Sequence, residues 1–128
     1  MSRVRGILMV ISILGLAGCA VARVEGTAQP LPAGSQGVTM ELVSFAFRPN
    51  VVTVEAGQPI TITAKNESRG KHNVTVRSPE GRVLKSVDVP GRQTRTFELT
   101  LTEPARYALS CDVFLHPTFG MKGEFIAR

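Results

Sequence analysis

Four side chains of this sequence could together bind a metal ion: His72, Cys111, His116 and Met121. The two histidines are the only ones in the chain, and the two sulfur-bearing residues flank the second histidine at equal spacing in the segment CDVFLHPTFGM. Thiolate and thioether groups are soft ligands, and imidazole suits several transition metals, copper among them. The residue types therefore predict a small site for a single transition-metal ion.

The chemistry of this donor set is specific. Two imidazoles and a thiolate in a trigonal plane, with a weak axial methionine, form a blue-copper electron-transfer site. Soft donors stabilise Cu(I) and imidazoles support Cu(II), so one cage can hold both states with little movement. Each residue also has an ordinary interpretation, because a lone methionine usually fills a core and a buried cysteine behaves as a small hydrophobe. A single histidine is also more often structural than a ligand.

The N-terminal residues predict export. Arg3 and Arg5 precede an apolar run from Gly6 to Gly18. This run is shorter than the roughly 20 residues that a membrane-spanning helix needs. A basic start, a short apolar centre and small residues at the end are typical of a signal peptide. We expect residues 1–18 to be this signal.

The segment LAGC, which ends at Cys19, resembles the lipobox of bacterial lipoproteins. The resemblance implies cleavage before Cys19, lipid on its sulfur, and attachment to a bacterial membrane outside the cytoplasm, on the periplasmic side or at the cell surface. The alternative is an ordinary secretory signal with an incidental cysteine. A lipidated Cys19 could not form a disulfide with Cys111, which would then be a free thiol in an exported protein. Metal ligation would explain such a thiol.

Composition narrows the remaining function classes. The formal net charge is +5, but no basic stripe with interleaved aromatic residues predicts nucleic-acid binding. Residues 20–37 are rich in Ala, Gly, Pro and Gln, so we expect residues 19–37 to form a lipidated tether. The alternative, that part of this segment packs as an edge strand, stays open.

Residues 38–128 show short alternating apolar runs separated by turn residues, and nothing longer than a turn has a helical period. This spacing predicts one all-β domain, an antiparallel β-sandwich of about eight strands. Cys111 would end one strand, Met121 would precede the last, the loop between them would carry His116, and His72 would begin another strand. The expected strands cover residues 38–47, 50–57, 59–66, 72–78, 82–90, 94–101, 105–111 and 123–128.

The domain resembles the cupredoxins, the blue-copper family that includes plastocyanin, azurin and rusticyanin. The segments that carry the resemblance are FAFRPNVVTVEAGQPITITAKN, KHNVTV, the Pro-Gly turn at 90–91, ARYALSC and HPTFGMKGEF. The resemblance implies a Greek-key β-sandwich that binds one Cu(I)/Cu(II) ion. It further implies imidazole ligands at His72 and His116, a thiolate ligand at Cys111, an axial ligand at Met121, and a hydrogen bond from Asn73 across to the cysteine loop.

The function implied by this resemblance is that of a one-electron carrier outside the cytoplasm, a monomer that is not an enzyme. Electrons would pass to redox partner proteins through the edge of His116, within an apolar patch. Residues of this patch are Phe114, Leu115, Pro117 and Phe119. Copper enzymes of related type need further histidines or a second loop cysteine, which this domain lacks. The alternatives are a copper-binding protein that delivers the ion to copper-accepting proteins, and a metal-free interaction domain.

Overall fold

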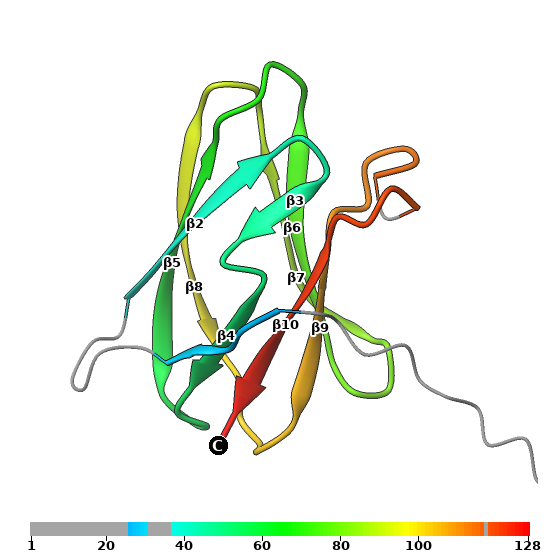
Figure 1. Cartoon of the computed structure of the whole chain (residues 1–128). Coiled ribbons are helices and arrows are strands. Elements are labelled where there is room, and N and C mark those ends of the chain that lie inside the picture. The colour runs from blue at the N-terminus through cyan, green and yellow to red at the C-terminus, as the bar shows by residue number, and fades with distance from the viewer. Residues whose placement is uncertain (1–25, 31–36, 117) are drawn as a thin grey trace, which may run out of the picture.

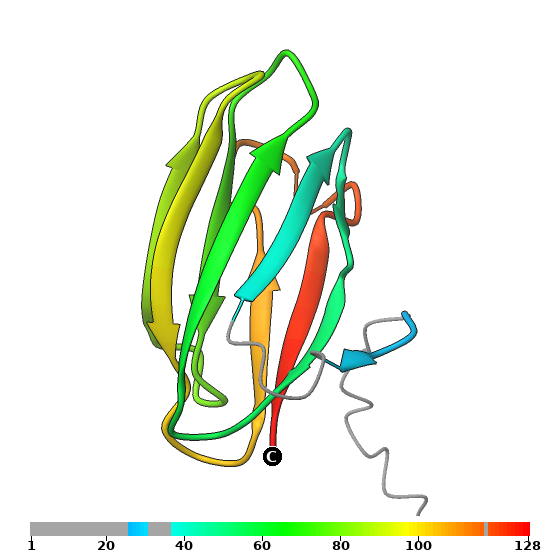
Figure 2. The ribbon, with the colours of Figure 1, turned by 90° about the vertical axis from the view of Figure 1, so that its left-hand side faces the viewer.

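Strands with alternating apolar and polar residues assemble into two sheets that pack face to face (Figure 1 and Figure 2). The structure is a computed structural model that describes residues 26–30, 37–116 and 118–128. The six-stranded sheet contains, in spatial order, β1 (Gln29–Pro30), β4 (Val51–Val54), β10 (Lys122–Ala127), β9 (Arg106–Ser110), β6 (His72–Arg77) and β7 (Val83–Val89). The four-stranded sheet contains β3 (Ala46–Arg48), β2 (Gly37–Val43), β5 (Pro59–Asn66) and β8 (Thr94–Thr100).

The predicted all-β sandwich is confirmed, but the expectation of purely antiparallel pairing was wrong. In the described ranges β1 pairs parallel with β4, β4 with β10, and β2 with β5. The reason lies in the connections: β3 and β5, the chain neighbours of β4, both belong to the opposite sheet. Since a short hairpin turn joins only antiparallel neighbours, β4 instead pairs with strands that are remote in sequence.

Two segments differ in detail from the predicted strands. The range 38–47 is divided into β2 and β3 by a turn that contains Ser44 and Phe45. Phe45 has a φ of 59°, a left-handed conformation that is unusual for a bulky residue. Within the segment expected to be a tether, Gln29 and Pro30 pair with β4, as in the alternative that part of it forms an edge strand.

The core lies between the sheets and follows the alternation of the strands. In β5 the side chains of Ile60, Ile62 and Ala64 are buried, and the residues between them are partly exposed. β2 and β10 show the same period of two, as expected for strands with one face toward the core. The largest fully buried side chains include Phe125, Met40, Leu42, Ile62, Leu101, Leu109 and Met121.

The predictions for the signal peptide, for Cys19 and for Pro117 concern positions outside the described residues. Within the described ranges, the chain has no helix of the length and apolarity required to cross a membrane.

Candidate metal centre

Strand alternation aims three of the four predicted ligands toward one end of the core. On β6 the residues His72, Val74 and Val76 share the buried face. Cys111 follows β9 in the same register as its buried residues, and Met121 precedes β10 in the register of Gly123 and Phe125. Because β10, β9 and β6 are neighbours in one sheet, these positions converge.

The metal-binding atoms of His72, Cys111 and His116 form a compact triangle. The two Nδ1 atoms are 3.0 Å apart. The Cys111 Sγ lies 3.7 Å from His72 Nδ1 and 3.3 Å from His116 Nδ1. All three atoms lie within 4.8 Å of one another, so the structure brings together three residues that are up to 44 positions apart in the sequence.

These distances fit a first-row transition metal. An ion bound in a trigonal plane at about 2.0 Å from nitrogen and 2.3 Å from sulfur would separate the nitrogens by roughly 3.5 Å and each nitrogen from sulfur by roughly 3.7 Å. The triangle in the structure agrees with this to within about half an ångström. With two imidazoles and one thiolate, it has the equatorial donor set of a type 1 copper site.

The backbone of Met121 is hydrogen-bonded to two of the residues that form this triangle. Its N–H donates to the carbonyl of His116 at 3.1 Å, and its carbonyl accepts from the N–H of Cys111 at 3.2 Å. The side chain is fully buried. Backbone hydrogen bonds therefore hold Met121 next to Cys111 and His116, and its role as the fourth ligand stays a prediction.

The two histidines differ in their surroundings. His72 is buried, and burial together with the neighbouring His116 lowers the pKa of its imidazole. A lowered pKa favours the neutral imidazole, the form that binds metals. His116 is partly exposed, so its ring is the part of the cluster that approaches solvent.

The ring of Phe45 covers the His116 imidazole. The two rings meet edge to face with their centroids 5.2 Å apart, and Phe45 also contacts Phe119 at 5.1 Å. The sequence did not identify Phe45 as a site residue. The pattern of residues 38–47 shows no turn signal, yet a turn at Ser44 and Phe45 directs the Phe45 ring toward His116. The backbone is left-handed at Phe45, Arg92 and Leu115. Such strained conformations concentrate at functional sites, so they distinguish this region from the rest of the described chain.

Asn73 connects β6 with the residue that follows the cysteine. Its side-chain Oδ1 accepts a hydrogen bond of 2.7 Å from the N–H of Asp112. Its own N–H lies 3.4 Å from the Cys111 sulfur. Asn73 therefore makes the contact with the cysteine loop that was expected of it, and its N–H also contacts the sulfur directly.

Buried Asn66 supports the segment that leads to His72. Its side-chain amide donates to the carbonyls of Gly70 and Val89, at 2.8 and 2.9 Å. Its Oδ1 accepts from both the N–H and the hydroxyl of Ser68. Because Val89 is the β7 partner of His72, this network fixes the start of β6 and so the position of the first histidine.

Known proteins resemble this chain in sequence and in structure. The family model of the cupredoxin-like domain matches residues 6–127. No curated protein matches the chain. Among solved structures, the reduced auracyanin of Roseiflexus castenholzii has a TM-score of 0.67 and 19% identity, covering 73% of this chain and 98% of its own.

Two further structures are similar. Auracyanin A, a blue copper protein of Chloroflexus aurantiacus, has a TM-score of 0.65 and 20% identity and covers 78% of this chain and 100% of its own. The metal-binding domain of the Cu(I)-exporting P-type ATPase CopA of Streptococcus pneumoniae, solved with Cu(I), has a TM-score of 0.60 and 16% identity and covers 84% and 99%. At these identities the likeness shows a shared fold.

Proposed function

Because this chain belongs to the cupredoxin-like domain family, we propose that it is a type 1 copper protein that carries single electrons outside the cytoplasm. One observation carries the proposal: two Nδ1 atoms and one Sγ lie 3.0 to 3.7 Å apart at the end of the sandwich. This triangle is built from both histidines of the chain. No histidine remains for a second copper site, so we propose no enzymatic activity.

We assign equatorial roles to His72, Cys111 and His116 and an axial role to Met121. Copper, when bound, would supply a one-electron Cu(I)/Cu(II) couple. The residues themselves supply a rigid cage: His72, Cys111 and Met121 are buried, and backbone hydrogen bonds close the loop from Cys111 to Met121. A cage that moves little between oxidation states suits electron transfer.

The surface around His116 supports docking of a partner. Exposed apolar side chains lie around the partly exposed His116 ring, and none of them belongs to the buried core. They are Phe45, Phe114, Leu115 and Phe119. Since exposed apolar groups that gather at one place mark interaction sites, we propose that redox partner proteins dock here and exchange electrons through the His116 edge. We expect the protein to act as a monomer.

We further propose that residues 1–18 are removed, that Cys19 carries lipid and that residues 19–37, of which Gln29 and Pro30 pair with β4, connect the domain 38–128 to a bacterial membrane. The support is the LAGC segment after a short apolar run. In the producing bacterium, Cys19→Ser should move the protein from the membrane to the soluble fraction. Equal membrane association of both forms would contradict lipid anchoring.

Addition of Cu(II) to the purified protein tests the copper assignment. A thiolate–copper bond should produce an intense visible charge-transfer band, and Cys111→Ser should abolish it. A control is Thr102→Ala, which removes an exposed hydroxyl outside the loop from Cys111 to Met121 and leaves the thiolate in place. A colourless protein without bound copper would refute the assignment.

Copper delivery is the second candidate, and one comparison favours it: the similar ATPase domain was solved with Cu(I). A carrier should show reversible voltammetry and slow loss of copper to a chelator. A delivery protein should release copper quickly to an acceptor and cycle poorly at an electrode. Measuring both rates on the same preparation separates the two functions.

A further inference from the structure

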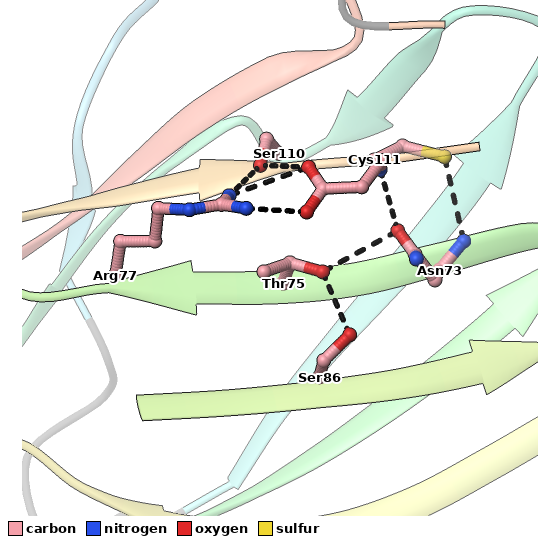
Figure 3. Close-up of polar contacts among 7 residues, drawn as sticks. Asn73, Thr75, Arg77, Ser86, Ser110 and Cys111 are labelled. Atoms are coloured by element: carbon pink, nitrogen blue, oxygen red, sulfur yellow. Dashed lines mark hydrogen bonds and ion pairs between the residues drawn. The ribbon is translucent and has the colours of Figure 1, made fainter. Parts of the chain in front are cut away.

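Polar side chains of β6, of β7 and of the end of β9 form a connected row next to Cys111 (Figure 3). Arg77 of β6 donates to the Asp112 carboxylate through both terminal nitrogens. Arg77 Nη1 also donates to the Ser110 hydroxyl at 2.7 Å, and that hydroxyl donates to Asp112 at 2.8 Å. These three side chains, here called the clasp, therefore tie the end of β9 to the end of β6.

The clasp acts on the residue next to the thiolate. Asp112 follows Cys111 directly, and its side chain is held by Arg77 and Ser110 while its N–H donates to Asn73 Oδ1 at 2.7 Å. Asn73 in turn places its own N–H 3.4 Å from the Cys111 sulfur. Asp112 is thus held through both its side chain and its N–H. Because Asp112 directly follows Cys111, these contacts restrict the position of the Cys111 sulfur relative to the Asn73 N–H.

The arrangement is more than a surface ion pair with one contact. A two-pronged guanidinium–carboxylate contact defines orientation as well as distance. The side chains of Arg77 and Asp112 are 28% and 36% exposed, so water screens the pair only in part. A lysine at position 77 would keep the charge but lose the planar fork.

We propose that the Arg77–Asp112 pair is a positioning device for the Cys111 thiolate. It fixes the peptide between Cys111 and Asp112, and thereby fixes the hydrogen bond that the sulfur receives from the Asn73 N–H. Hydrogen bonds to the cysteine sulfur tune the reduction potential of a blue-copper site. The part of this proposal that concerns copper rests on the proposed function, whereas the positioning itself exists in the metal-free protein.

The chain offers a matched control pair. Arg106 and Glu124 form an ion pair between β9 and β10, in the same sheet and also through a guanidinium and a carboxylate. Glu124→Gln removes the same charge as Asp112→Asn but does not touch the Cys111 loop. Arg77→Lys complements these variants, because it keeps the charge of the clasp and removes its fork.

Amide hydrogen exchange, measured by NMR on the metal-free protein, tests the positioning. In Asp112→Asn and Arg77→Lys the amides of Asn73 and Asp112 should exchange about tenfold faster, given the usual strength of a partly exposed charged hydrogen bond. Glu124→Gln should leave them unchanged, and core amides such as that of Val74 should report an intact fold. Equal protection of Asn73 and Asp112 in all variants would overturn the proposal.

The copper-loaded protein provides the second readout. Both clasp variants should shift the charge-transfer band and release copper about 10- to 100-fold faster, the usual effect of losing a contact that orients a ligand. Glu124→Gln should match the unmodified protein. If no variant binds copper while exchange still responds to the clasp, the proposed function fails and the positioning stands. If the band is present and Arg77→Lys and Asp112→Asn leave it unshifted, the pair does not position the thiolate.

Discussion

Met121 is the residue whose two roles, ligand and core filler, are easiest to separate. The side chain is fully buried, and leucine has nearly the same volume without the sulfur. Met121→Leu should therefore cost less than about 1.5 kcal/mol of unfolding free energy and should retain copper, but its reduction potential should change because the axial ligand tunes it.

Urea unfolding and voltammetry check this expectation. Met121→Ala serves as the packing control, since loss of buried volume should cost about 2–5 kcal/mol. An unchanged potential in Met121→Leu would assign Met121 to the core alone.

Phe45 shields His116 without binding metal. Because its ring packs against the His116 imidazole, Phe45→Ala should uncover His116 and speed the transfer of copper to a chelator severalfold. Phe45 is 42% exposed, so the cost in stability should stay below about 2 kcal/mol. Phe114→Ala is the control, because Phe114 is 84% exposed. Equal transfer rates in the two variants would remove Phe45 from the site.

At the scale of residues, donor types and order were sufficient to predict the cluster. His72, Cys111 and His116 were singled out because few other residues of the chain could bind a soft metal. Phe45 and Arg77 could not be found in this way, since phenylalanine and arginine are common in any β-domain. Their roles depend on a turn and on strand register, which are properties of the folded sheet.

At the scale of elements, the β5–β6 loop and the β7–β8 turn form one support for His72. Asn66 N–H donates to the carbonyl of Gln93, and Arg92 N–H donates to that of Ser68. Gly91 packs so closely that a Cβ there would overlap the carbonyl oxygen of Arg69. The glycine of the Pro-Gly turn is therefore required by a close approach of two backbones.

Gly91→Ala should destabilise the protein by about 1–3 kcal/mol, the usual cost of inserting a methyl group into packed structure. It should also weaken copper binding, since the displaced loop precedes His72. Gly70→Ala lies in the same loop and meets no atom within 4 Å, so its unfolding midpoint should be nearly unchanged. Equal denaturation midpoints for the two variants would contradict the close approach.

Strand positions were more predictable than strand partners. The run at residues 59–66 coincides with β5 (Pro59–Asn66), and most other predicted ranges differ by a residue or two. Alternation of side chains is a local property that the sequence shows directly. Parallel pairing of β4 with β10 joins segments that are far apart in the sequence, and no local signal encodes it.

At the scale of the whole molecule, copper should be linked to stability. An ion that binds only the folded state stabilises it by about 2.7 kcal/mol when its free concentration is 100 times the dissociation constant. For a domain of this size the melting temperature should rise by about 10 °C or more. Calorimetry of the metal-free and loaded protein measures the rise, and Cys111→Ser should lose most of it. No rise in the unmodified protein would argue against a site formed by the fold.

The left-handed residues Phe45, Arg92 and Leu115 have a consequence for how this protein can be engineered. In the described chain these are the non-glycine residues with positive φ; Phe45 and Arg92 line one hollow with His116, and Leu115 precedes it. Each strained conformation costs of the order of 1–3 kcal/mol. Glycine at Arg92 should therefore raise the thermal stability, whereas at Phe45 the lost contacts with His116 and Phe119 would offset the relief of strain.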